Sequence, residues 1–336
     1  MYRHIIVYFL VLAFVACKND SAVKVEPKAV ETPTNEVATR TERKVENPIQ
    51  REAVQEEKET VTSTIRSSNT SGDGKVDTVT VSSVEDLVKN ARSNRVIYLE
   101  KGKYKLQTEL VYYMTKDEQK IIDKRVVDTR SIGGQLFFMG LDNVQIIGKE
   151  GAEVISNNPK AVAFFVVRSK NWKISNLTIK KEINGTAELS YISNSQNIEF
   201  DGCTFDGGGS YGMYINNVDN LKVNNSTISK CFNGALRIRR STGINFMNSL
   251  ITGNECKVPI VNVYESGSTV VFNNVKIINN KKDQSSTFQD SDRIFAAGDN
   301  TIRLENCTVQ NNVGYRNLGL GMASLSKSRV DGVTIP

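Results

Sequence analysis

Histidine is almost absent from this chain of 336 residues. The single histidine is His4, which lies in an N-terminal stretch with the features of a targeting segment. Without that stretch the chain has no imidazole, which excludes histidine-based acid–base catalysis, Ser-His-Asp triads and histidine metal sites. The net charge of +6 favours an anionic partner without requiring one, and we expect no nucleic-acid partner.

The N-terminal stretch has Arg3, the apolar run IIVYFLVLAFVA and then Cys17. The run is too short to span a bilayer and has the length of a signal-peptide core. FVAC resembles the lipobox of bacterial lipoproteins, with Phe14 where leucine is usual. The resemblance implies a signal peptide over residues 1–16, an acyl chain such as palmitate on Cys17, and anchoring in the cell envelope, at the outer membrane or cell surface. An ordinary signal peptide with a chance cysteine is the alternative.

Residues 17–75 contain too few large apolar side chains to form a hydrophobic core. From Lys18 to Gly74 there is no Phe, Trp or Tyr, and three of the six prolines lie here, at Pro27, Pro33 and Pro48. Such a segment buries too little apolar surface to offset its ordering entropy. We therefore predict a disordered tether over residues 17–75 and a folded domain over residues 76–336.

The folded part contains a repeat. NIEFDGCTF, NLKVNNSTI and GINFMNSLI share alternating apolar residues and a Gly or Asn five positions after the first residue. Spacings of 23 to 32 residues between repeats indicate a repeat array. The first residues of the repeats are Asn143, Asn171, Asn197, Asn220, Gly243, Thr269, Thr301 and Lys327. The fifth-position residues tolerate left-handed backbone, so we expect corners there, with Asn side chains hydrogen-bonded in ladders.

Period-two alternation excludes helical repeats, and the leucine pattern of leucine-rich repeats is missing. Before the array, Val84–Ser93 has helical spacing, RVIYL is strand-like and Gly102 marks a turn. This order resembles the pectate-lyase superfamily from about Val76 to the end. The resemblance implies an all-β fold, a single-stranded right-handed parallel β-helix with a short N-terminal capping helix.

The cysteines of the array fit a core. Cys203 and Cys307 both occupy the sixth position after a repeat start, so we expect both to point inward, four coils apart and too far for a bridge. Cys231 and Cys256 lie on adjacent coils, and whether they pair stays open.

The strand before each repeat start supplies outward side chains. Aligning these strands predicts one outward row of Phe137, Phe165, Tyr191, Tyr214, Arg237, Asn262 and Phe295, and a second of Asn216, Arg239 and Tyr264. Aromatic faces and arginines in a line suit an extended acidic sugar chain. The predicted ligand-binding residues are Phe165, Tyr191, Tyr214, Arg237, Arg239, Tyr264 and Phe295. A loop or the tether covering the row is the alternative.

Complete catalytic signatures of pectate lyases, polygalacturonases and pectin methylesterases are missing. Asp201 and Asp206 cluster near Glu199 beside a glycine-rich loop. Such a pair suits glycoside hydrolysis or calcium binding, although solvated coil-edge charges are the plainer interpretation. No other metal or cofactor is expected.

Three functions stay open from the sequence. The first is a lipid-anchored envelope protein that binds, or processes, an acidic polysaccharide. The second is an active polysaccharide lyase or glycoside hydrolase acting on uronate-containing glycans, with Arg237 or Arg239 as base and Tyr214 or Tyr264 as acid. The third is a non-enzymatic surface adhesin or structural protein.

Overall fold

The computed structural model describes residues 76–106, 128–265, 267, 269–288, 290–319 and 322–332. The predicted signal peptide, Cys17 and the tether lie outside these residues. No helix in the described ranges is long and apolar enough to cross a membrane.

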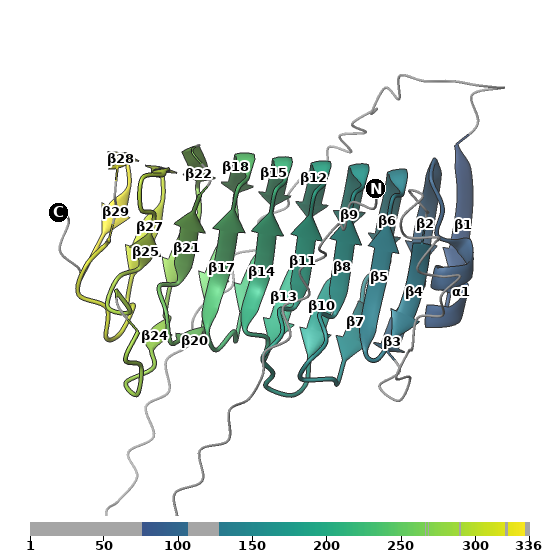
Figure 1. The fold of residues 1–336 in the computed structure, drawn as a ribbon, viewed down its shortest axis with the longest axis horizontal. Coiled ribbons are helices and arrows are strands. Elements are labelled where there is room, and N and C mark those ends of the chain that lie inside the picture. Colours follow the sequence, from purple (N-terminus) through teal and green to yellow (C-terminus); the bar gives the residue numbers. More distant parts are fainter. Residues whose placement is uncertain are drawn as a thin grey trace, which may run out of the picture. The chain divides into compact units, whose positions relative to one another are not determined.

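The described chain winds into coils whose strands form three parallel sheets, with the coils side by side from β1 to β29 (Figure 1). Sheet A consists of β1 (Asp77–Val81), β2 (Arg95–Leu99), β6 (Asp142–Gly148), β9 (Lys170–Ser175), β12 (Gln196–Asp201), β15 (Asp219–Asn224), β18 (Thr242–Met247), β22 (Thr269–Asn273), β26 (Thr301–Glu305) and β28 (Met322–Ser326). Sheet B consists of β3 (Gly102–Leu106), β7 (Ala152–Ser156), β10 (Thr178–Lys181), β13 (Thr204–Gly207), β16 (Thr227–Ser229), β19 (Leu250–Thr252), β23 (Lys276–Ile278), β27 (Thr308–Gln310) and β29 (Arg329–Val330).

Sheet C consists of β4 (Asp128–Ile132), β5 (Gln135–Met139), β8 (Phe164–Val167), β11 (Ser190–Ser193), β14 (Tyr211–Asn216), β17 (Gly234–Arg239), β21 (Val261–Tyr264) and β25 (Phe295–Ala296). A further short pair joins β20 (Glu255–Cys256) and β24 (Lys281–Lys282). In sheet C, β4 pairs antiparallel with β5, which the repeat pattern did not predict. Elsewhere each strand pairs in parallel with its counterpart on the next coil, as β14 does with β17.

Helix α1 (Val84–Asn90) lies at the β1 end of the coils (Figure 1). Ser83 caps it, because the Ser83 Oγ accepts the Asp86 N–H at 3.0 Å. Val84 and Leu87 are buried in the common core, which confirms the capping helix. The helix ends before the expected Ser93 because the backbone turns extended at Ala91.

Inward side chains of successive coils stack on one another. Phe246 and Phe272, for example, have ring centroids 5.0 Å apart and nearly parallel planes. Cys203 and Cys307 are buried in the core, as predicted. Cys231 and Cys256 are also buried, and all four cysteines of the described chain are free thiols.

The corners follow the predicted backbone at most repeats. Asn225 has φ 50° and Asn248 has φ 51°, both left-handed. Gly148 serves a different need, because a Cβ there would lie 2.3 Å from the carbonyl oxygen of Asn176. The long asparagine ladder runs through the first residues of the repeats: Asn171 donates to Asn143 at 2.9 Å, and the ladder continues through Asn197 and Asn220. At the fifth positions, Asn274 donates to Asn248 at 2.8 Å.

The predicted start of the last repeat, Lys327, is wrong by five residues. Met322 pairs with Thr301, so the strand of the last coil begins at Met322. Lys327 instead occupies the following corner, with φ 49°. The prediction failed because this corner has Lys327 instead of the Gly or Asn found at the corresponding corners of the other repeats. Gly332 lies five residues after Lys327, which matches the spacing expected between a repeat start and its corner.

Candidate functional site

Sheet C brings most of the predicted outward side chains into one line. Its register places Phe137, Phe165, Tyr191, Tyr214, Arg237 and Asn262 opposite one another on six successive coils. We call these six residues the aromatic row. Each is partly exposed, whereas the neighbours on either side of each strand position point into the core. The same register confirms the second row, in which Asn216, Arg239 and Tyr264 are opposite one another.

Phe295 does not belong to the row, contrary to the sequence prediction. Phe295 pairs with Val261, and Ala296 takes the position opposite Asn262. The Phe295 side chain is fully buried, with its ring centroid 5.9 Å from that of Phe272. A shift of one residue in the pairing of a strand moves each side chain to the opposite face of the sheet. The short strand β25 follows a long loop, and the loop sequence does not indicate at which residue the pairing begins.

The rings of the row stack on each other rather than facing solvent. The centroids of Phe165 and Tyr191 are 4.7 Å apart, those of Tyr191 and Tyr214 are also 4.7 Å apart, and the planes differ by 8° and 4°. This separation matches the spacing of adjacent strands, so in-register rings cover each other's faces. The expected stacking of sugar rings on these faces therefore has no room at Tyr191. The row offers ring edges and hydroxyl groups instead.

Arg237 ends the stack. Its Cζ lies 4.7 Å from the ring centroid of Tyr214, 5.2 Å from that of Tyr264 and 5.6 Å from that of Tyr211. Its Nε donates a hydrogen bond to the Tyr264 hydroxyl. Among the described residues, no carboxylate forms an ion pair with its guanidinium, although the charge of Arg237 acts on the nearby Glu188. The cation is held by rings and keeps N–H groups for another partner.

Arg239, unlike Arg237, forms an ion pair. Its guanidinium binds both oxygens of Glu265, at 2.9 to 3.1 Å, and Arg240 donates to the same carboxylate at 2.8 Å. Hydrogen bonding from Arg239, with help from Arg240, lowers the pKa of Glu265. The two arginines therefore have an internal counter-ion, although both side chains remain partly or fully exposed.

Two residues near Arg237 were missed by the sequence reasoning. Tyr211 is almost fully buried, and its ring lies where a Cβ on residue 234 would be, 2.6 Å away, so Gly234 is required there. Burial raises the pKa of Glu188, while the nearby charges of Arg237 and Lys181 oppose that rise. Glu188 lies in the loop before β11, outside the repeat, whereas Tyr211 is the first residue of β14 and pairs with Gly234, so aligning the whole strand could have identified it.

Tyr264 keeps its proton in this site. Burial and a hydrogen bond with Tyr214 raise its pKa, and the charge of Arg237 opposes the rise without cancelling it. A neutral phenol beside a fixed guanidinium is suited to donating a proton or hydrogen bond to a bound oxygen.

Asp201 and Asp206 do not form a paired site. Asp201 lies on β12 in sheet A and Asp206 on β13 in sheet B. Asp206 pairs with Lys230 at 2.9 Å, and Asp201 accepts from Asn225 at 2.8 Å. The coil-edge interpretation fits these contacts. In the described ranges, no group of three or more His, Cys, Asp or Glu is arranged to hold a metal ion.

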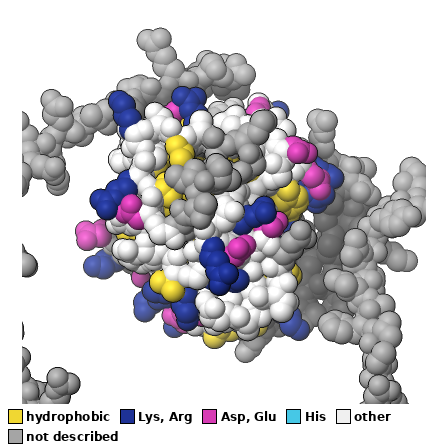
Figure 2. All heavy atoms as spheres, turned by 90° about the vertical axis from the view of Figure 1, so that its left-hand side faces the viewer, with side chains coloured by type: hydrophobic (Ala, Val, Ile, Leu, Met, Phe, Trp, Pro, Cys, Tyr) yellow, Lys and Arg dark blue, Asp and Glu magenta, His cyan; other side chains and the backbone are white. Residues whose placement is uncertain are grey.

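Charges of both signs alternate over the face that Figure 2 shows, with Lys and Arg next to Asp and Glu. No single-sign field covers that face. The view shows the end of the coils next to β28 and β29.

Comparison with known proteins places the fold. A family model described as "Right handed beta helix region" matches residues 144–289. Together with the parallel sheets, this match confirms the expected fold class, a right-handed parallel β-helix with one helix among the described residues. A comparison with curated protein sequences found no match.

Several solved structures are similar at low identity. Pectate lyase Pel9A shares 14% identity and a TM-score of 0.49, over 75% of this chain and 62% of the lyase. This chain thus spans less than two thirds of that lyase. An alginate lyase from Paenibacillus sp. str. FPU-7 shares 12% identity and a TM-score of 0.35, over 77% of this chain and 100% of the lyase. A pectin methylesterase mutant in complex with a hexasaccharide shares 11% identity and a TM-score of 0.42, over 69% and 75%.

Proposed function

We propose that this β-helix binds an acidic, uronate-containing polysaccharide and that Arg237 receives one of its carboxylates. The observation that carries the proposal is a partly buried guanidinium, fixed between tyrosine rings, with no carboxylate partner among the described residues. Arginine binds carboxylates through paired N–H groups, and a site with restricted water access strengthens that bond. Arg239 and Arg240, which share Glu265, are secondary contacts.

The stacked rings act as a support in this proposal. Phe165, Tyr191 and Tyr214 form a rigid column that ends beneath the Arg237 guanidinium. The column reduces the rotamer freedom that Arg237 would lose on binding, which favours affinity. Tyr264 then places a hydroxyl beside the bound carboxylate or a sugar oxygen.

The proposal includes attachment to the cell envelope. The FVAC motif at residues 14–17 supports removal of residues 1–16 and lipid attachment at Cys17, with residues 17–75 as a tether to the outer membrane or cell surface. Cys17→Ser should abolish the lipid and release the chain from membranes. Unchanged membrane association, together with no lipid mass on the wild-type protein, would contradict this part.

Binding is tested by calorimetry of the domain from residue 76 with oligogalacturonates. Arg237→Ala should weaken binding by about 10- to 100-fold, because a charge-assisted bidentate contact is lost. Arg316→Ala is the control, since it removes an equally charged but fully exposed arginine far along the chain. If the two variants weaken binding equally, the binding is nonspecific charge attraction and Arg237 has no special role. If the wild type does not bind, an adhesin or structural role is favoured.

Lyase activity is a second candidate, favoured by the protonated Tyr264 next to Arg237. In β-elimination, a base from solvent would remove the proton at C5, the Tyr264 phenol would protonate the leaving oxygen at C4, and Arg237 would neutralise the uronate carboxylate. Arg237 is an unsuitable base, because the phenolic oxygens around it raise its pKa in spite of burial. The test is the ultraviolet absorbance of unsaturated uronate on pectate, alginate and glycosaminoglycans, with Tyr264→Phe as the variant that should lose it.

A further inference from the structure

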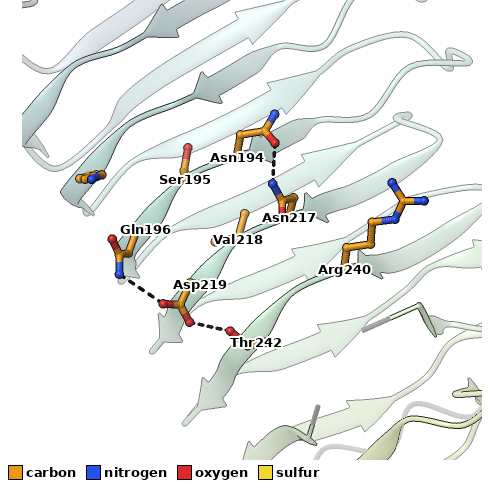
Figure 3. A pocket seen from close by; sticks show the side chains of 9 residues that line it. Asn194, Ser195, Gln196, Asn217, Val218, Asp219, Arg240 and Thr242 are labelled. Atoms are coloured by element: carbon orange, nitrogen blue, oxygen red, sulfur yellow. Dashed lines mark hydrogen bonds between the residues drawn. The ribbon is translucent and has the colours of Figure 1, made fainter. Parts of the chain in front are cut away.

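A hollow lined mostly by residues with polar side chains includes Arg240 and lies at the corner where sheet C passes into sheet A (Figure 3). Its volume is about 400 Å³, within the range of sites that hold small ligands. One wall is formed by corner residues that follow sheet C strands, and the other by the first residues of sheet A strands. The first wall includes Asn194, Asn217 and Arg240, and the second includes Gln196, Asp219 and Thr242.

Asp219 is the centre of the second wall. Figure 3 shows its carboxylate between Gln196 and Thr242, which precede and follow it on adjacent coils. The Gln196 Nε2 donates to Asp219 at 3.2 Å, and the Thr242 hydroxyl donates to its other oxygen. Both donors are uncharged, and no Lys or Arg of the described residues forms an ion pair with Asp219. The carboxylate is exposed and retains lone pairs for further donors.

Charges of both signs line the hollow, so an ion of either sign would meet a like charge in it. A bound anion would face Asp219, which repels it. A bound cation would face Lys170 and Arg240, both of which line the hollow. A neutral ligand with several hydroxyl groups meets neither penalty, and each hydroxyl both donates and accepts. The two carboxamides of the first wall, which bond each other from Asn217 to Asn194 at 2.7 Å, add further donors and acceptors.

The hollow is continuous with the proposed carboxylate site. Arg240, on its wall, directly follows Arg239 and shares Glu265 with it. From Arg237 to Thr242 is five residues, at most about 17 Å of extended chain. A short oligosaccharide therefore reaches from Arg237 to the hollow along one coil, at right angles to the aromatic row, whose ring faces are already covered.

We propose that this hollow is a subsite for an uncharged sugar and that the ligand is a heteroglycan in which neutral sugars adjoin uronates. The proposal rests on the proposed function, since it places the neutral sugar next to a uronate bound at Arg237. Asp219 accepts sugar hydroxyls, and Gln196 and Thr242 hold its carboxylate in place.

The test compares two probes with equal numbers of carboxylates. One is a hyaluronan oligosaccharide, in which glucuronate alternates with neutral N-acetylglucosamine, and the other is an oligogalacturonate. The wild type should bind the alternating probe at least about fivefold more tightly. Asp219→Ala should remove about tenfold in affinity for that probe, through lost hydrogen bonds to a charged group, and little for the oligogalacturonate.

Asp299→Ala is the control, because it removes an exposed carboxylate at a later corner of the same kind without touching the hollow. Thr242→Val, which keeps shape and removes one donor to Asp219, should give a smaller loss in the same direction and guards against a folding defect in the first variant. Arg237-dependent oligogalacturonate binding without any preference or Asp219 effect would overturn the subsite and leave the proposed function standing. Failure of the wild type to bind either probe would overturn both.

Discussion

The outward faces of sheets A and C belong to the same coils but differ in how their charged side chains are paired. On sheet A, Glu199 lies between Lys173 and Lys222 on adjacent strands, and Lys173 bonds Glu199 at 2.9 Å. On sheet C, the corresponding line is aromatic as far as Tyr214, and the next residue, Arg237, contacts tyrosine rings and has no ion pair with a carboxylate of the described residues. A face that balances its own charges has little to offer an ionic ligand. A face that leaves one fixed cation without an ion pair has a binding group.

The largest expected effect separates inward from outward aromatics on sheet C. Phe295→Ala should lower the free energy of unfolding by about 3–5 kcal/mol, because it leaves a cavity in the core. Phe165→Ala, on the partly exposed row, should cost about 1–2 kcal/mol, through lost ring stacking and reduced apolar burial. Urea denaturation of both variants measures the difference. Equal losses would mean that the register of β25 is assigned wrongly.

An intermediate effect concerns the support beneath Arg237. Tyr214→Ala should weaken binding of an acidic oligosaccharide by about fivefold, near 1 kcal/mol, because the guanidinium loses a cation–π contact and its fixed position. Tyr214→Phe retains the ring and should retain most of the affinity. If Phe and Ala at this position behave alike, the hydroxyl rather than the ring is the important group.

The smallest effect concerns Glu265. Hydrogen bonds from Arg239 and Arg240 lower its pKa in the folded state, so its contribution to stability is present above the ordinary glutamate pKa and is lost as the pH falls through the lowered value. The thermal midpoint of the wild type should slightly exceed that of Glu265→Gln at neutral pH, and the two should converge in acid. Parallel midpoints over the whole range would show that the ion pairs contribute nothing.

Glu265→Gln also sharpens the comparison of the two arginine states. Without the Glu265 carboxylate, Arg239 and Arg240 have no ion pair, as Arg237 has none. The affinity of the protein for an acidic oligosaccharide should therefore rise severalfold. Unchanged affinity in this variant would place both arginines outside the ligand's path.

Most of the fold was predictable because it repeats. A side chain such as Tyr214 is placed by alternation within a strand and by the same position on the neighbouring coils, so two independent patterns agree. Phe295 and Lys327 were misplaced where an insertion or an unusual corner breaks that agreement. The repeat has no information about loop conformation, which places Glu188 before β11.

The stacking of the rings in the aromatic row could have been predicted from the sequence, but it was not. Outward rings at one position of successive coils are separated by the strand spacing, close to the distance at which aromatic rings stack. Phe165, Tyr191 and Tyr214 therefore had to cover one another. The internal pairing of Arg239 with Glu265 was not predictable, because it depends on the left-handed corner at Glu265.

The central claim is that Arg237 binds a carboxylate of the ligand, and a double-mutant cycle with a modified ligand tests it most directly. Wild type and Arg237→Ala are titrated with an oligogalacturonate and with its fully methyl-esterified form. Esterification should weaken binding to the wild type by about 10- to 100-fold and have little effect on Arg237→Ala, since the contact is already lost. Equal losses on esterification in both proteins would contradict the account.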